Sequence, residues 1–553
     1  MNCSEHGFRW GGPRRFRRGG ARRWTTAAAV AGATVALGLS GTAQAADHHG
    51  RDRLSPDNLV VSTSVYHHAD ITSGVTVLPP GCTSDCAIAT ADGTYPYVFN
   101  NVLVDPSFGV ASPIVLDRIS PTGRPQGRIA VPPSEMVTSF SSKSELAINR
   151  STSGRELTFM GYVAPLDGID VSNSNTPAAP DPTNPVSSQH YRAVAALSGS
   201  GRLSYTETNA YSGNNGRAAI ANDSGGRPVI YTAGNAGNGS NPQPTGVVLG
   251  AGAQILDQRF SPEHAQSPGT PTPVASFSVS QLGDKPDKIG KDDNFRGETI
   301  FDNVLYYTKG SGSNGVNTVY FVDTTGKACP NGVGIPQPGA KLPRSPLAYD
   351  PSTLAADGLP SNMCVLSGFP TTLAKSSTAA PFGIWFANPH TLYVADEGNG
   401  DNTYSASTNQ YTGAAAQTGA GLQKWVLDSK TDPTNPTWKL AYTLQQGLEL
   451  GQPYQVPGYP LGDNAATGLP WAPATDGLRN ITGRVSPNGT VTIWAVTSTV
   501  SGGGDQGADP NQLVSITDHP SASAPAAGEQ FQTVIAPRYG RVVRGVSPAP
   551  RGF

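Results

Sequence analysis

Apolar and small polar residues alternate over short runs along most of the chain, and the runs come in pairs joined by tight turns. Residues 299–301 (TIF) and 305–308 (LYYT) form one such pair, and residues 383–386 (GIWF) and 392–395 (LYVA) form another. A period of two residues predicts strands that are buried on one face. Further strands follow each pair, so every unit is predicted to be a four-stranded antiparallel sheet. The innermost strands are expected to begin near Glu145, Arg217, Gly297, Phe382, Leu478 and Arg544.

The last of these units is incomplete. Residues 543–548 (VRGVSP) resemble the end of residues 478–487 (LRNITGRVSP), but the chain stops where the second strand should follow. A strand with the missing pattern occurs at residues 58–66 (NLVVSTSVY). Pairing of these two segments would close a ring of sheets without an open edge. The sequence therefore predicts an all-β protein, a six-bladed β-propeller formed by residues 58–553 as one domain.

The connections between strands are predicted to differ in length on the two faces of this ring. Those between second and third strands are long, as at residues 67–112 and 396–420, whereas the turns after the inner strands are short. We call the face with the long connections, where the inner strands begin, the loop face, and the opposite face the turn face. Loops on a rigid scaffold commonly carry binding sites, so a ligand is expected at the centre of the loop face. The insertion at residues 323–363 should extend the turn face.

Residues 1–45 have the features of a cleaved export signal. Seven arginines precede or flank the start of an apolar segment at residues 27–39, and Ala43-Gln44-Ala45 offers a cleavage site. Paired arginines favour the twin-arginine export route. The apolar segment is shorter than the roughly 18–20 residues that a membrane span requires. The sequence thus predicts a secreted, extracellular protein without a membrane span, in which residues 46–57 are a flexible segment.

Removal of that signal leaves 31 Lys and Arg against 39 Asp and Glu, a formal charge of −8. Proteins that bind nucleic acids need a basic field along the phosphate backbone. A nucleic-acid partner is therefore disfavoured, and any anion site must be local. The chain also lacks the phosphate-binding loop, the dinucleotide fingerprint, the serine-hydrolase elbow and the paired-histidine zinc motif.

Four cysteines remain after the signal, which fits an oxidising compartment. Proximity in the sequence favours the disulfides Cys82–Cys86 and Cys329–Cys364, although four cysteines allow three pairings. A zinc site is the weaker alternative, because the spacing is not that of two Cys-x-x-Cys knuckles and no histidine pair accompanies it.

A cation stands at the predicted start of five of the six inner strands, and the starts of these strands surround the central funnel of a propeller. These cations are Lys143, Arg217, Arg296, Arg479 and Arg544. Guanidinium groups that converge on one axis would suit a carboxylate, phosphate or sulfate, because each offers paired donors in a fixed fork. Asn215 and Asn294 are expected to assist in binding, and Lys143 or Glu145 is a candidate acid or base. The alternative is structural, with each arginine tying one blade to the next.

Acidic residues gather in two of the long loops. Asp396, Glu397 and Asp401 lie in one loop, and Asp505 lies in another. Carboxylates in loops that can wrap around a hard cation are candidate ligands for Ca²⁺. The alternative is that these residues form Asx turns in exposed loops.

The stretch at residues 291–320, together with residues 210–217, resembles the blade pattern of secreted bacterial β-propeller proteins of largely unassigned function. Six-bladed relatives by architecture are phytase-like phosphatases, which depend on calcium, and gluconolactonase-like metal hydrolases. Propeller polysaccharide lyases act on uronates. None of their catalytic motifs matches this chain residue by residue, so the resemblance implies a fold and leaves the catalytic residues open.

Two functions are therefore expected. The first is an exported enzyme that binds, and hydrolyses or cleaves, an anionic substrate in the central funnel, either a phosphoester or a uronate-containing glycan. The second is a non-catalytic propeller that binds a glycan or a protein on the same face. In either case the protein is expected to be a monomer with a small anionic molecule or a glycan as its partner.

Overall fold

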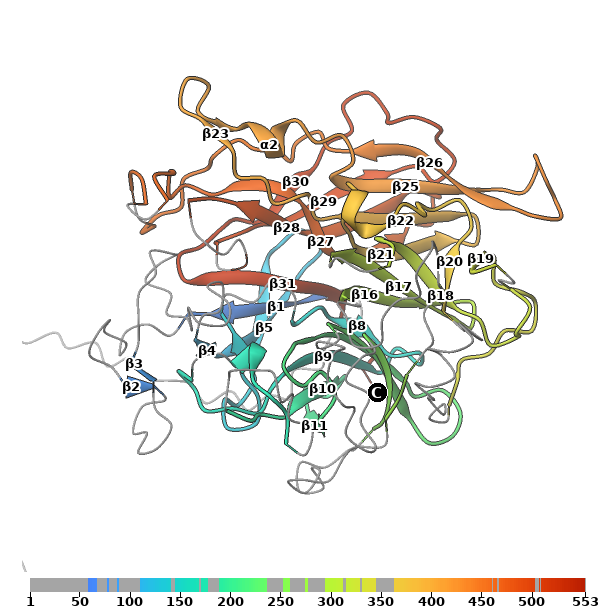
Figure 1. The fold of residues 1–553 in the computed structure, drawn as a ribbon, viewed down its shortest axis with the longest axis horizontal. Coiled ribbons are helices and arrows are strands. Elements are labelled where there is room, and N and C mark those ends of the chain that lie inside the picture. Colours follow the sequence, from blue (N-terminus) through green and yellow to red (C-terminus); the bar gives the residue numbers. More distant parts are fainter. Residues whose placement is uncertain are drawn as a thin grey trace, which may run out of the picture. The chain divides into compact units, whose positions relative to one another are not determined.

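Strands dominate the part of the chain that the computed structural model describes (Figure 1). The described residues are 58–66, 77–78, 87–88, 110–140, 145–168, 171–177, 188–235, 252–258, 274–276, 294–311, 315–328, 331–344, 363–459, 461–464, 467–502, 507 and 509–552. They all belong to one unit, residues 51–553. The predicted export signal and the segment at residues 46–57 lie outside them. Within these ranges, no helix is long and apolar enough to cross a bilayer.

The strands form six antiparallel sheets, numbered here as blades and given from the inner strand outward. Blade 1 contains β31 (Arg541–Pro548), β1 (Leu59–Val65), β5 (Ile114–Ile119) and β6 (Pro125–Ala130). Blade 2 contains β8 (Asn149–Arg150), β9 (Glu156–Tyr162), β10 (Arg192–Ser198) and β11 (Leu203–Thr208). Blade 3 contains β12 (Gly216–Asn222), β13 (Val229–Gly234), β14 (Ala253–Asp257) and β15 (Val274–Ser276).

Blade 4 contains β16 (Asn294–Phe301), β17 (Val304–Ser311), β18 (Thr318–Val322) and β20 (Met363–Leu366). Blade 5 contains β21 (Pro381–Asn388), β22 (Thr391–Asp396), β25 (Gly421–Asp428) and β26 (Thr437–Leu444). Blade 6 contains β27 (Ala474–Val485), β28 (Val491–Val500), β29 (Leu513–Asp518) and β30 (Gln532–Ile535). Short pairs outside the blades are β2 (Val77–Leu78) with β3 (Ala87–Ile88), β4 (Ala111–Ser112) with β7 (Thr138–Ser139), and β23 (Tyr404–Ser405) with β24 (Gln410–Tyr411). The short helices are η1 (Val171–Asn173), η3 (Ala374–Ser376) and α2 (Thr412–Ala415).

The predicted six-bladed propeller is confirmed, with two departures from regularity. Blade 4 has a fifth strand, β19 (Val333–Gly334), which pairs in parallel with β20 and comes from the predicted insertion. The inner strand of blade 2 is only two residues long, because the backbone at Leu146 has a φ of 69° and cannot continue an extended strand through that position.

The ring closes as predicted, by pairing of the first and last strands. β1 runs antiparallel to β31, with Leu59 opposite Pro548 and Val65 opposite Arg541 (Figure 1). The register shifts between Ser62 and Thr63, where a β-bulge increases the local twist. The other edge of β1 pairs with β5, so both edges of this strand are satisfied.

The apolar core lies between neighbouring blades, and hydroxyl groups add a repeated tie across the same interfaces. Thr158 in blade 2 donates to the carbonyl of Ala219 in blade 3 at 2.6 Å. Ser62 in blade 1 donates to the carbonyl of Leu146 at the inner side of blade 2, also at 2.6 Å. In both cases a buried hydroxyl on a second strand satisfies a backbone carbonyl at the inner side of the next blade.

The two predicted disulfides stay predictions. Cys364 is fully buried in β20, within the cluster between blades 4 and 5. Cys82, Cys86 and Cys329 lie outside the described residues.

Candidate functional site

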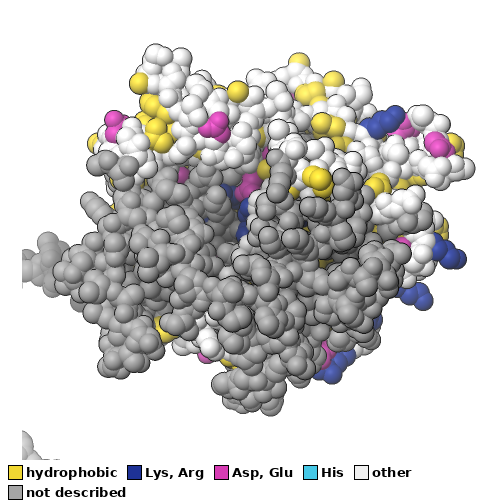
Figure 2. All heavy atoms as spheres, in the orientation of Figure 1, with side chains coloured by type: hydrophobic (Ala, Val, Ile, Leu, Met, Phe, Trp, Pro, Cys, Tyr) yellow, Lys and Arg dark blue, Asp and Glu magenta, His cyan; other side chains and the backbone are white. Residues whose placement is uncertain are grey.

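Three of the predicted cations come together near the axis on the loop face. They are Arg217 in β12, Arg296 in β16 and Arg479 in β27, and all three side chains are buried. Burial lowers the pKa of Arg217 well below its usual value, the charge of Arg296 lowers it further, and the carboxylates of Glu145 and Glu397 raise it. Figure 2 shows Lys or Arg and Asp or Glu side chains together at the bottom of a hollow near the centre of the visible face.

Glu397 is the counter-charge at the centre of this group. Its two carboxylate oxygens pair with Arg296 at 3.3 Å and with Arg479 at 3.2 Å. Glu397 follows the second strand of blade 5, while the arginines belong to blades 4 and 6. One carboxylate therefore links three consecutive blades, which is the structural role that the sequence left open as the alternative to ligand binding.

The proposed acid or base is also drawn into the protein. Glu145 is 1% exposed and accepts a hydrogen bond from the hydroxyl of Tyr162 in β9. The guanidinium of Arg192 lies 5.1 Å from the ring centre of the same tyrosine. Lys143, the other candidate, lies outside the described residues.

The remaining predicted ligand-binding residues make contacts within the protein. Arg544 in β31 donates to the carbonyl of Phe140. Asn294 donates to the hydroxyl of Ser311 at 2.6 Å, and the carbonyl of Asn215 accepts a backbone hydrogen bond at 2.9 Å. The structure thus brings three of the four arginines together, and carboxylates of the protein, Glu145 and Glu397, lie close enough to interact with them.

The predicted calcium ligands are held mainly by backbone groups. Asp396 accepts two backbone hydrogen bonds, at 2.8 and 3.0 Å, and Asp401 binds the backbone and hydroxyl of Thr403 at 2.9 and 2.6 Å. Asp505 lies outside the described residues. No group of three His, Cys, Asp or Glu side chains in the described ranges is arranged to hold a metal ion. The geometry of Asp401 is that of an Asx turn.

A cavity of about 270 Å³ opens beside this network and contains an acid that the sequence analysis missed. Arg296, Glu397 and Arg479 line it, together with Asp476 in β27. Burial raises the pKa of Asp476 to about 6, although hydrogen bonds from Gly400 and a glutamine lower it. Asp476 stands three residues before Arg479 in the inner strand, and that proximity was the only signal in the sequence.

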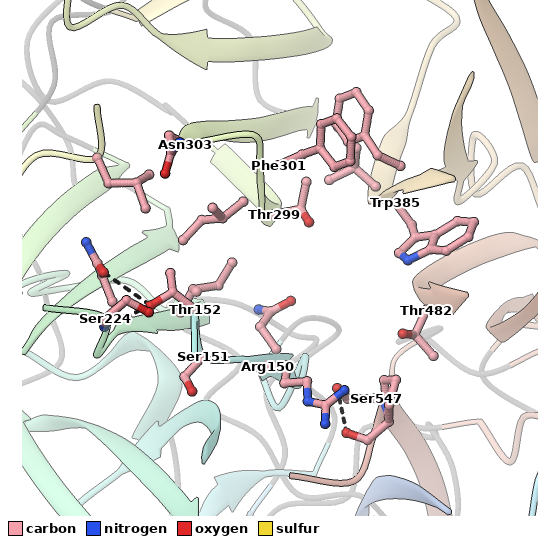
Figure 3. Close-up of a pocket in the computed structure, with 18 of the residues that line it drawn as sticks. Arg150, Ser151, Thr152, Ser224, Thr299, Phe301, Asn303, Trp385, Thr482 and Ser547 are labelled. Carbon is pink, nitrogen blue, oxygen red and sulfur yellow. Dashed lines mark hydrogen bonds between the residues drawn. The ribbon is translucent and has the colours of Figure 1, made fainter. Parts of the chain in front are cut away.

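A second cavity lies on the turn face, where the inner strands end (Figure 3). This turn-face channel has a volume of about 840 Å³. Each of the six inner strands contributes to its wall, which places the channel on the propeller axis. The contributing side chains include Arg150, Asn222, Thr299, Trp385, Thr482 and Ser547.

Trp385 gives this wall one broad aromatic surface. The residue is half-buried, and a Cβ atom at Gly483 in the next blade would lie 2.6 Å from three atoms of its indole ring. Glycine at this position therefore lets the ring lie against the backbone of β27. The accessible part of the indole faces the channel, across from Thr152 and Ser224 (Figure 3).

The charged residues of the channel wall are cations. Arg150, Lys341 and Arg344 line it, and none of the described lining residues is Asp or Glu. Burial lowers the pKa of Arg150, and the charges of two further arginines lower it more. Arg344 donates to Asn222 at 2.9 Å and to the carbonyl of Ser224 at 2.6 Å. The insertion thus reaches across the turn face to blade 3, as its position in the sequence predicted.

The sequence analysis placed the ligand on the loop face because the long connections gather there. The channel residues were missed because they stand at the ends of inner strands, next to short turns. A signal was available, since several of these strands end in polar residues: residues 149–152 (NRST), 222–224 (NDS) and 301–303 (FDN).

Comparisons with known proteins identify no family. No family model matches the chain, and no curated protein matches it. Among solved structures, a thermostable family-43 glycoside hydrolase aligns at 11% identity and a TM-score of 0.29, over 75% of this chain and 97% of the hydrolase. An ulvan lyase of polysaccharide lyase family PL25 aligns at 11% identity and a TM-score of 0.29, over 83% of this chain and 94% of the lyase. Both likenesses are too slight to bear on function.

Proposed function

We propose that this protein is exported and binds a glycan that carries an acidic group, in the turn-face channel. One observation carries the proposal: the channel wall combines an accessible indole, a circle of hydroxyl and amide side chains, and cations, with no carboxylate among its described lining residues. The two arginines of the loop face that share Glu397 are buried and already paired within the protein, so the cations of the turn face are better placed to attract a ligand.

The chemistry of this wall is complementary to a sugar ring. A sugar presents an apolar C–H face, which suits a flat aromatic surface such as Trp385. Its hydroxyl groups both donate and accept, as do the hydroxyl groups of Thr299 and Thr482 in the channel wall. A uronate or sulfate would pair with Arg150 or Lys341. The volume of about 840 Å³ falls within the roughly 300–1,000 Å³ of small-molecule sites.

Calorimetric titration with uronate oligosaccharides, and with the same oligosaccharides reduced to neutral sugars, tests the proposal. Trp385→Ala should weaken the binding of both the acidic and the neutral oligosaccharides by at least about tenfold, because the stacking surface is lost. Arg150→Gln should weaken only the acidic ligand, by about ten- to a hundredfold, since one charge-assisted hydrogen bond is worth roughly 1.5–3 kcal/mol.

The matched control is Trp471→Ala, which removes a half-buried tryptophan that does not line the channel. Binding by this variant should equal that of the unaltered protein. Undiminished binding by a folded Trp385→Ala variant would show that the channel is not the glycan site.

A second candidate function is cleavage of a phosphoester or a uronate-containing glycan at the loop face. The observation in its favour is Asp476, whose pKa of about 6 suits proton transfer near neutral pH. It shares a cavity with Glu397 and Arg479. Turnover in a panel of phosphoesters and uronate glycans that is lost in Asp476→Asn but retained in Trp385→Ala would establish this activity. No turnover with any of these substrates would leave binding as the function.

A further inference from the structure

A third cavity lies at the seam where the ring closes, between blade 1 and the end of blade 6. This seam cavity has a volume of about 110 Å³. Its walls come from β5, β6 and β31 and from the connection that follows β30. The floor is apolar and includes Ile119, Ile535 and Val543.

The polar wall of the seam cavity carries four arginines and one carboxylate. The arginines are Arg118, Arg128, Arg538 and Arg541, and the only acid among its described lining residues is Asp117. Arg128 binds one oxygen of Asp117 at 2.7 Å, and Arg541 lies 3.7 Å from the other. The cavity therefore has three positive charges in excess of its own carboxylate.

The backbone holds these arginines close to one another. Arg538 and Arg541 flank a turn closed by a backbone hydrogen bond of 3.1 Å, with Gly540 at a φ of 65°. The guanidinium of Arg118 packs over Gly127, where a Cβ atom would lie 3.5 Å from its Nη1 atom. The Nε–H of Arg118 is buried and has no hydrogen-bond partner among the described residues.

Arg541 is affected both by burial and by the neighbouring charges. Burial lowers its pKa, and Arg128 and Arg538 lower it further, while Asp117 raises it. Guanidinium groups gathered in one concave site repel each other unless an anion compensates them. The same groups that repel each other would each donate to a bound oxyanion.

We propose that the seam cavity binds a tetrahedral oxyanion, a phosphate or sulfate group, between these four arginines. Such a group has enough oxygens to engage several guanidinium forks at once, and it fits a cavity of about 110 Å³. Asp117 competes for the same donors through its contacts with Arg128 and Arg541. Its carboxylate therefore lowers the affinity of the cavity for the anion.

Calorimetric titration with inorganic phosphate and with sulfate, at constant ionic strength maintained with chloride, tests the proposal. Both should bind saturably at one site, whereas chloride should not. Arg541→Gln should weaken binding by at least about tenfold through the loss of a charge-assisted contact. Asp117→Asn should instead strengthen binding several-fold, because it removes the competing carboxylate. The control is Arg227→Gln, which breaks an ion pair of 3.3 Å with Asp257 outside the cavity and should leave anion binding unchanged.

Arg128→Gln provides a second test if Arg541→Gln does not fold. Half of the Arg128 side chain is exposed, so its replacement should disturb the fold little. Titration with methyl phosphate and a monosaccharide sulfate distinguishes the sources of the group. Ester binding as tight as that of the inorganic ions indicates a group carried on a larger molecule, and tight binding of the inorganic ions alone indicates a free ion. The proposal would be overturned if chloride bound as tightly as phosphate and sulfate, or if both arginine variants bound phosphate as tightly as the unaltered protein.

Discussion

Glu397→Gln should destabilise the whole propeller, because this one carboxylate pairs with buried arginines from two blades. The substitution retains the shape of the side chain and removes its charge. Arg296 and Arg479 would then lose the carboxylate that they share, in surroundings where their side chains are only 7% and 5% exposed.

The expected magnitude follows from this burial. Removal of one partner from a buried ion pair costs about 3–5 kcal/mol. The two pairs share one carboxylate, so their losses are not independent and should not be added. We therefore expect a loss of about 3–5 kcal/mol in the free energy of unfolding. Asp257→Asn is the control, because its partner Arg227 is 63% exposed and such surface pairs contribute about 0–1 kcal/mol.

Urea unfolding at low salt measures the difference, since urea leaves ion pairs unscreened. The midpoint should fall for Glu397→Gln at an unchanged slope, and it should hardly move for Asp257→Asn. Glycan affinity at the turn face should be the same in both variants. A loss for Glu397→Gln no larger than that for the control would refute the structural role of the carboxylate.

Two further predictions concern packing and pH. Gly545→Ala should lower the free energy of unfolding by about 1–3 kcal/mol, because its Cβ atom would lie 2.4 Å from the carbonyl oxygen of Leu146 in the next blade. The control is Gly419→Ala, where the nearest atom would lie at 3.9 Å. Equal urea midpoints for the two variants would contradict the prediction. Burial raises the pKa of Glu298 well above 4.5. The folded protein therefore retains a proton that the unfolded chain releases, and stability falls as pH rises from about 4.5. The stability of Glu298→Gln should not fall in this way. The free energy of unfolding of the variant, minus that of the unaltered protein, should therefore be larger at about pH 8 than at about pH 4. Parallel pH profiles of the two proteins would exclude this explanation.

The fold could be predicted from the sequence because each blade repeats a local pattern. Short runs such as residues 305–308 predict the strands, although both faces of that run are buried between neighbouring blades. The split repeat shows which strands must pair. β1 and β31 pair as predicted. The bounds of two inner strands could not be predicted in the same way: β27 begins at Ala474 instead of near Leu478, and β8 has only two residues. They depend on contacts with neighbouring blades and on one residue with positive φ.

The roles of the arginines could be predicted only in part. Their recurrence at the starts of inner strands correctly placed Arg217, Arg296 and Arg479 close together. Recurrence alone does not tell whether an external anion or a carboxylate of the protein pairs with them. That depends on Glu397, which stands about a hundred residues from Arg296 and meets it only when blades 4 and 5 are adjacent.

The two ends of the inner strands meet different electrostatic requirements. At the loop face, Arg296 and Arg479 are buried with Glu397, so their charges must be balanced within the protein for the blades to pack. At the turn face, Arg150 and Lys341 line an open channel that has no lining carboxylate in the described residues, so a ligand can supply the opposite charge. Substitutions at the starts of the inner strands should therefore change stability before affinity, and substitutions at their ends should change affinity before stability. Measurement of both properties for Glu397→Gln and Arg150→Gln separates the two roles within a single protein.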